Sequence, residues 1–191
     1  MINNVENIAT FINVVFTITS KWWDERTLNG ITEIHRGLDI ATGSNDTVYS
    51  ILNGVIHSKG YDESMGNWVI IHDNQVGSQT YGYATLYMHL RDSVTLAIGT
   101  LVSKNEPIGI EGDTGYAFGI HLHVEMQDIS RFNNQWHWSY VKSDYLDPTL
   151  YMGIENTEGT RWLYDGSPTP PIPTENKKHH YKFYLFKKNR F

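Results

Sequence analysis

Short β-rich runs divided by glycine, asparagine and aspartate fill the chain between residues 45 and 128. Several runs alternate apolar and polar residues, which is the period of a strand with one buried face. No stretch of a dozen residues shows helical periodicity. The pattern predicts a mostly β protein, an antiparallel β-sheet or sandwich whose edges and loops shape a groove. The expected strands are Val48–His57, Asn67–Asp73, Thr85–Leu90, Val94–Ile98, Pro107–Glu111 and His121–Gln127.

The rest of the 191-residue chain predicts appendages around one domain. The apolar stretch Ile8–Ile18 is rich in β-branched and aromatic residues, which favours a strand. No Lys or Arg precedes it, so there is no clear signal peptide. The expected units are an N-terminal strand or lead-in (1–29), the main domain (30–150), a C-terminal extension (151–165), a Pro-rich linker (166–176) and a basic-aromatic tail (177–191).

The charge distribution and the absence of cysteine limit which partners and which metal ligands the protein can have. The tail Lys177–Phe191 carries six Lys or Arg and no acid, which leaves nine basic against 21 acidic side chains in the rest of the chain. An acidic body argues against nucleic acid as a partner, because phosphate binding relies on basic surface. The tail is either a solvated appendage or an attachment to wall polymers, to a membrane or to a larger assembly such as a phage tail. Cysteine is absent, so any metal must have nitrogen and oxygen ligands.

The first motif that carries chemistry is Glu33–Ile40, which holds His35 and Asp39 four residues apart. Gly37 lies between them and allows the backbone to turn, so the imidazole and the carboxylate can converge on one ion. Imidazole with carboxylate suits Zn²⁺. Taken alone, such a pair is more often a surface ion pair or a capped turn.

Two further motifs lie on predicted strands. In Gly119–Glu125, His121 and His123 are two residues apart and therefore point to the same face. In Leu86–Leu90, the same spacing places Tyr87 and His89 together. A half-polar sheet face and a histidine packed between strands are the ordinary explanations of the two patterns.

The three motifs together predict a metal-centred groove. A catalytic zinc site needs three protein ligands and one open position for water. His35, Asp39 and one of the paired histidines supply three ligands. The other paired histidine and His89 would remain beside the metal to move protons or stabilise an oxyanion. Spacing alone leaves open whether His121 or His123 is the ligand.

In their order along the chain, His-x-Gly-x-Asp, Tyr-x-His-Leu and His-Leu-His resemble the lysostaphin-like family of zinc peptidoglycan endopeptidases. The framework agrees. Val48–Ile56 is similar to the family's strand-turn-strand, Gly66–His72 to its Gly-Asn-x-Val strand, and Gly99–Gly115 to its series of turns. The resemblance covers about residues 30–128. Phe118 and Ile120 depart from it, standing where the family usually has a small hydroxyl residue and often proline.

This resemblance implies roles for the five site residues. His35, Asp39 and His123 correspond to the zinc ligands, and His89 and His121 to the non-ligating catalytic pair.

Three other residues receive less specific expectations. Asn67 and Tyr87 are predicted to bind substrate along the groove. Glu125 follows His123 on the same strand face, so it either orients that ligand or is an ordinary solvated glutamate.

The predicted function is a zinc metallo-endopeptidase that hydrolyses peptide bonds in the stem peptides or cross-bridges of bacterial peptidoglycan. Its site of action would be extracytoplasmic: secreted, in the cell wall or on a virion. The alternative is a catalytically inactive wall-binding or scaffold protein on the same fold. Such proteins typically lose a ligand or a catalytic histidine, whereas this chain has all five.

Overall fold

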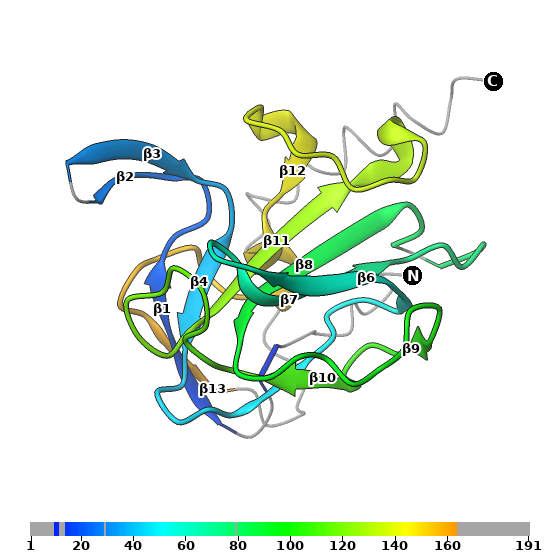
Figure 1. Ribbon diagram of the computed structural model, residues 1–191. Helices are drawn as coiled ribbons and strands as arrows, with labels where there is room; N and C mark the ends of the chain where they lie inside the picture. Colours follow the sequence, from blue (N-terminus) through cyan, green and yellow to red (C-terminus); the bar gives the residue numbers. More distant parts are fainter. Residues whose placement is uncertain (1–9, 12–13, 29, 79, 164–191) are drawn as a thin grey trace.

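A computed structural model describes residues 10–11, 14–28, 30–78 and 80–163 (Figure 1). The predicted linker and tail lie outside these residues, and the apolar stretch that begins at Ile8 lies outside them in part. The strands are β1 Val15–Ser20, β2 Asp24–Leu28, β3 Ile31–His35, β4 Leu38–Ala41, β5 Thr47–Tyr49, β6 Gly54–Asp62, β7 Gly66–His72, β8 Tyr83–Leu90, β9 Leu101–Val102, β10 Pro107–Ile110, β11 Leu122–Asp128, β12 Tyr145–Leu146 and β13 Arg161–Leu163.

Within this described part of the chain, nine strands form one antiparallel sheet with the order β13-β1-β4-β11-β8-β7-β6-β9, and β12 pairs with β11 outside that order. Two smaller sheets accompany it. Strands β5 and β10 pair below the main sheet, and β2 and β3 form a hairpin that projects away from it (Figure 1). The predicted antiparallel β fold is confirmed.

The middle of the main sheet is covered on both faces. Strands β8 and β11 are buried over nearly their whole length. The side chains of β8 are divided between two hydrophobic clusters, whereas β11 contributes apolar side chains to the larger cluster and buried polar ones to the other face of the sheet. The larger cluster contains Leu122, Val124 and Tyr87, and the smaller contains Leu86 and Met88. Because both faces of β8 and β11 are packed, the side chains that these strands direct into the groove have a rigid support.

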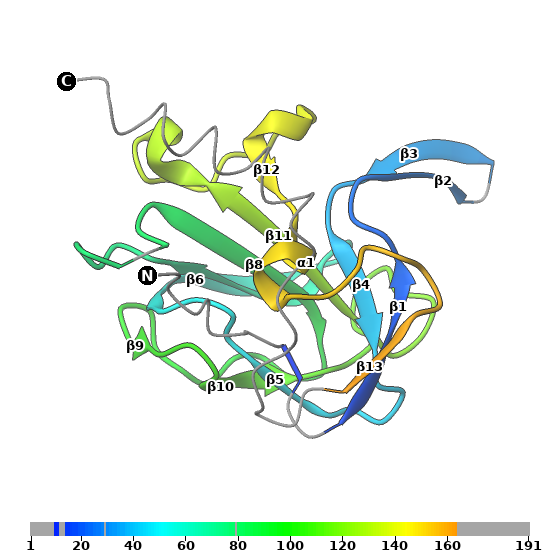
Figure 2. The same cartoon turned by 180° about the vertical axis from the view of Figure 1, so that it is seen from behind.

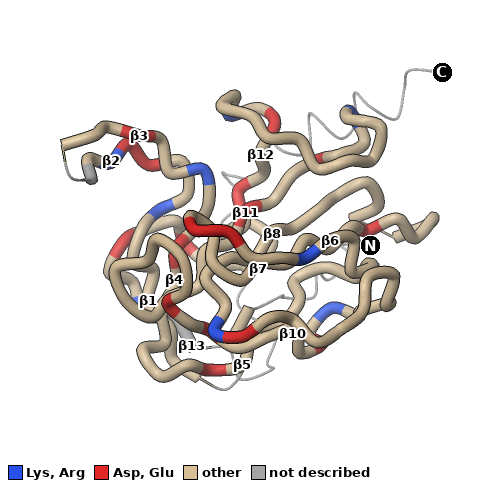
Figure 3. Tube along the Cα trace, viewed as in Figure 1, with Lys and Arg blue, Asp and Glu red and all other residues tan. Residues whose placement is uncertain are grey.

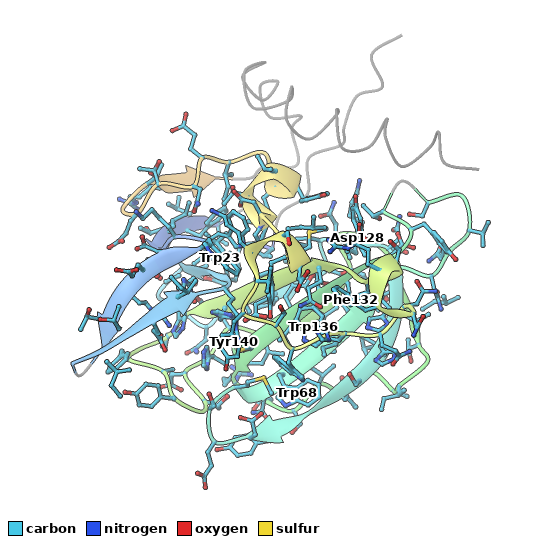
Figure 4. All side chains as sticks on the ribbon, turned by 90° about the horizontal axis from the view of Figure 1, so that it is seen from above. Trp23, Trp68, Asp128, Phe132, Trp136 and Tyr140 are labelled. Carbon is cyan, nitrogen blue, oxygen red and sulfur yellow. The ribbon has the colours of Figure 1, made fainter. Side chains whose placement is uncertain are left out.

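Helical structure is limited to short segments among the described residues. These are the 3₁₀ turns η1 Ile129–Phe132 and η2 Lys142–Asp144 and the single-turn helix α1 Pro148–Met152. Helix α1 lies on the face of the main sheet that is turned toward the viewer in Figure 2. No helix in the described residues is long and apolar enough to cross a membrane. The segment after β11 crosses over the sheet. Figure 4 shows it from above, with Phe132, Trp136 and Tyr140 labelled.

Most of the predicted strands exist, with two errors. The run predicted as Val48–His57 holds two strands, β5 and β6, separated by a turn. The run Val94–Ile98 forms no strand, because Val94 enters the core while Ile98 is 62% exposed and β9 begins only at Leu101.

The main sheet extends past both limits of the predicted 30–150 domain. Strand β1 pairs with β4, which carries a predicted metal ligand, and β13 pairs with the outer side of β1. In the described residues Asp and Glu outnumber Lys and Arg, as the sequence of the body requires (Figure 3).

Candidate metal centre

His35, Asp39 and His123 converge at the base of the β2–β3 hairpin. His35 is the last residue of β3, and Asp39 lies in β4. In β11, His123 is the residue directly opposite Asp39, so pairing of β4 with β11 places the two side chains next to each other. All three residues are buried, and their ligand atoms lie within 4.8 Å of one another. The structure therefore brings the three predicted ligands together.

Gly37 allows this approach for a reason that the sequence did not reveal. A Cβ atom at this position would lie 2.4 Å from Nε2 of His123 and 2.8 Å from the carbonyl oxygen of Val124. Both distances are far shorter than van der Waals contact. The glycine of His-x-Gly-x-Asp is thus required because its backbone lies against the imidazole of His123.

The three ligand atoms form a tight triangle. Oδ1 of Asp39 lies 3.0 Å from Nε2 of His35 and 2.7 Å from Nδ1 of His123, and the two nitrogens are 3.0 Å apart. The other nitrogen of each imidazole has a partner of its own: Nδ1 of His35 lies 2.8 Å from the carbonyl oxygen of Lys21, and Nε2 of His123 lies 3.2 Å from Oε1 of Glu125.

These outer contacts assign the tautomers. A carbonyl and a carboxylate only accept, so His35 carries its proton on Nδ1 and His123 carries its proton on Nε2. The lone pairs of both rings then face the carboxylate of Asp39. Three electron-pair donors pointing at one another fit a cation at their centre, and two imidazoles with one carboxylate is a set that zinc takes in catalytic sites.

The local electrostatics favour positive charge at this point. Burial alone would raise the pKa of Asp39, but the adjacent imidazoles of His123 and His35 outweigh it and hold that pKa well below its usual range. Burial would likewise lower the pKa of His123, but the carboxylates of Asp39 and Glu125 raise it to about 9. The outer oxygen of Asp39 is held by Arg26, whose guanidinium donates over 3.1 Å.

His89 and His121 lie beside this triangle and outside it. Their ring centroids are 4.7 Å apart, and His89 is 6.2 Å from the ring of His123. Nδ1 of His89 donates to the carbonyl oxygen of Thr114 over 2.8 Å, and Nδ1 of His121 donates to that of Gly119 over 2.8 Å. The Nε2 atom of each ring is therefore the unprotonated one, and Nε2 of His121 is 3.9 Å from Oδ1 of Asp39.

The environment of His89 keeps its ring neutral. Burial, with the nearby His123 adding to it, lowers the pKa of His89 to about 4. A ring that is neutral at pH 7 can accept a proton or a hydrogen bond at Nε2.

The prediction that Tyr87 and His89 share one face, and that Tyr87 binds substrate, is wrong. Tyr87 is fully buried in the larger hydrophobic cluster, and its hydroxyl accepts from the backbone N–H of Ile51 over 2.9 Å. His89 has a φ of 62°, and the pairing of β7 with β8 is irregular beside it. This local break in the strand reverses the alternation and turns His89 into the groove with Met88.

Asn67 is also used by the protein itself. Its side-chain amide donates to the carbonyl oxygens of Leu90 and Arg91 over 3.2 Å, and its oxygen accepts from Ser93 over 3.2 Å. It is 8% exposed and is absent from the groove lining. Asn67 therefore fixes the end of β8, and its prediction as a substrate-binding residue is wrong.

The five residues open onto a groove of about 590 Å³. One wall carries Tyr116 and Phe118, which are 56% and 71% exposed and pack edge to face with ring centroids 5.3 Å apart. Trp138, 50% exposed, also lines the groove. Phe118, one of the two departures noted in the sequence, thus belongs to the groove wall and lies outside the metal set.

Two arginines of the site were missed by sequence reasoning. Arg26 lies in β2, opposite Glu33 of β3, and its guanidinium donates to Glu33 and to Asp39. Arg36, next to His35 in the chain, approaches Glu125 across the sheet. An arginine in a polar hairpin carries no signal by itself, although Arg36 could have been suspected from its place inside the first motif.

The histidine pair His57 and His72 lies elsewhere and forms no metal set. Their rings stack with centroids 3.7 Å apart. Burial, and then His57, lowers the pKa of His72 to about 4, and burial lowers the pKa of His57, so both are packed neutral side chains.

An antiparallel β-sheet that presents one compact His-Asp-His set and two uncommitted imidazoles to a groove is the arrangement of a mononuclear metal hydrolase. The chain belongs to Peptidase family M23, whose family model matches residues 33–137.

Individual relatives support this assignment. The chain is 35% identical over 114 residues to an uncharacterized metalloprotease of Buchnera aphidicola, covering 58% of this chain and 28% of that protein. It is 31% identical over 119 residues to the peptidoglycan DD-endopeptidase ShyA of Vibrio cholerae, covering 58% and 26%. It thus spans about a quarter of the length of these curated relatives.

A solved structure supports the fold. The catalytic domain of the antimicrobial peptidase lysostaphin from Staphylococcus simulans superposes with a TM-score of 0.52 at 22% identity, covering 72% of this chain and 89% of that one. The lysostaphin-like resemblance is confirmed.

Proposed function

We propose that this protein is a zinc metallo-endopeptidase that hydrolyses peptide bonds in the stem peptides or cross-bridges of peptidoglycan. The observation that carries the proposal is the convergence of His35, Asp39 and His123 beside two histidines that have free Nε2 atoms. Membership of a peptidase family and similarity to a protein named as a peptidoglycan DD-endopeptidase support the substrate class.

In this proposal His35, Asp39 and His123 hold the zinc ion through Nε2, Oδ1 and Nδ1. Bound zinc supplies a Lewis acid that polarises the scissile carbonyl and acidifies a water molecule. Arg26 keeps the second oxygen of Asp39 occupied, so the carboxylate presents one oxygen to the site. Burial of all three residues keeps their orientation fixed.

His89 and His121 act on the substrate in the groove. Each anchors its Nδ1–H on a backbone carbonyl and directs Nε2 toward the open side of the site. One accepts the proton of the attacking water and delivers it to the leaving amine. The other, neutral as well, accepts a hydrogen bond from the attacking water at Nε2 and so orients that water toward the scissile carbonyl.

The place of action follows from the substrate. Peptidoglycan lies outside the cytoplasm, so the protein acts in the cell wall or after delivery to it. The basic tail would serve as an attachment to wall polymers, a membrane or a larger assembly.

The test is digestion of purified sacculi of several known cross-bridge types, followed by mass spectrometry of the released fragments. New amino termini at one defined peptide bond are expected with zinc present and not with a chelator. Absence of cleavage on every cross-bridge type, with zinc confirmed in the protein, would favour an inactive scaffold.

A further inference from the structure

The carboxylate of Glu125 is buried beside the metal set. Glu125 is 1% exposed, and its Oε1 accepts from Nε2–H of His123 over 3.2 Å. Its Oε2 atom has no hydrogen-bond partner among the described residues. A buried carboxylate is costly unless it is paired. The ordinary solvated glutamate that the sequence allowed is therefore excluded.

Arg36 is the cation that compensates this charge. Its Nε lies 3.6 Å from Oε1 of Glu125. Arg36 is itself held from the other side, because it donates to the carbonyl oxygen of Ser139 over 3.3 Å and its guanidinium lies 5.0 Å from the ring centroid of Tyr140. These contacts place the guanidinium of Arg36 between Glu125 and the segment that follows β11.

The contacts form one chain that ends at a metal ligand. The aromatic segment that crosses over the sheet fixes Arg36, Arg36 fixes Glu125, and Glu125 fixes the Nε2 proton of His123. A metal-bound histidine needs its second nitrogen held, because this contact sets both the tautomer and the direction of the ring.

We propose that Glu125 and Arg36 are positioning residues that hold His123 with its Nδ1 lone pair facing the metal, and that Ser139 and Tyr140 anchor this pair. The inference rests on the proposed ligand set and deepens it. It gives the aromatic segment Phe132–Tyr140 a role in supporting the metal centre.

The experiment measures zinc alone, by competition with a chromophoric chelator, on the full chain. Glu125→Ala should weaken the affinity for zinc by about 10- to 100-fold. Glu125→Gln keeps an acceptor oxygen for His123 and should lose less. Arg36→Gln should fall between the wild type and Glu125→Ala. Glu111→Gln is the matched control, because Glu111 is equally buried but binds Thr42 away from the site, and its zinc affinity should not change.

A second measurement separates positioning from general destabilisation. Nitrogen-15 NMR of the zinc-loaded protein should show a single Nε2–H form of the His123 imidazole in the wild type and a mixture of forms in Glu125→Ala. Unchanged zinc affinity in Glu125→Ala, or the same loss in Glu111→Gln, would overturn the inference. If wild type binds zinc but cuts no peptidoglycan, the proposed function fails while these zinc measurements still decide the role of Glu125.

Discussion

At the scale of single residues, the direction of the nitrogen that carries no proton separates the four histidines of the site into two pairs. His35 and His123 place their outer N–H on Lys21 and Glu125 and direct the inner nitrogen at Asp39. His89 and His121 also anchor Nδ1, but their free Nε2 atoms reach the groove. Four identical side chains thus obtain two roles, because the unprotonated nitrogen faces Asp39 in His35 and His123 and the groove in His89 and His121.

This separation predicts different consequences for two groups of variants. His89→Ala and His121→Ala should fold, retain one zinc ion and lose about 10²–10⁴-fold in peptide hydrolysis, the usual loss for a general acid or base. His35→Ala, Asp39→Ala and His123→Ala should lose zinc as well, because each removes one of three ligands. Elemental analysis of the purified variants, together with fragment release from sacculi, measures both properties.

Each result has a clear contrary outcome. Full zinc occupancy in any ligand variant would remove that residue from the metal set. Zinc loss in both His89→Ala and His121→Ala would show that the division into ligands and catalytic residues is wrong.

At the scale of elements, the sequence predicted the buried strands and missed the polar ones. Strands β7 and β8 contain apolar runs, and β11 alternates apolar and polar residues, so all three were located to within a few residues. The β2–β3 hairpin was missed because β3 is exposed at every position before His35, so no hydrophobic pattern marks it. The face of the sheet on which the His89 side chain lies could not be predicted either. The prediction assumed that successive side chains of a strand alternate between faces, and the positive φ of His89 breaks this alternation.

The turn between β3 and β4 gives a sharp test of how elements build the site. Gly37→Ala would place a methyl group 2.4 Å from Nε2 of His123, so β11 or the turn must move. Such overpacking typically costs about 1–3 kcal/mol. We expect a lower free energy of unfolding and a marked loss of zinc affinity. Gly119→Ala is the control, because nothing lies within 4 Å of its added Cβ.

Denaturant unfolding and zinc competition measure the two effects. If Gly37→Ala bound zinc as tightly as Gly119→Ala, close packing of the turn against His123 would not be needed for the metal centre.

At the scale of the whole molecule, the acidic body and the basic tail suggest a division of labour. The described residues contain the complete metal set and the groove, whereas the tail Lys177–Phe191 concentrates six Lys or Arg after a Pro-rich segment. The sequence could predict the charge and composition of the tail. It could not identify what the tail binds, because a run of cations has the same composition in a solvated appendage and in an attachment to an anionic surface.

The last prediction tests this division. Truncation after Thr174 removes all six tail cations and should lower the fraction of protein that pellets with intact anionic cell walls. The remaining binding should depend less on salt, because screening acts on the exposed charges that were removed. Cleavage of a small soluble peptide should be unchanged, since the groove residues remain. A full-length chain with the six tail Lys and Arg replaced by Gln separates charge from the aromatic side chains. Equal pelleting of wild type, truncated and neutralised chains would exclude the tail as a wall attachment.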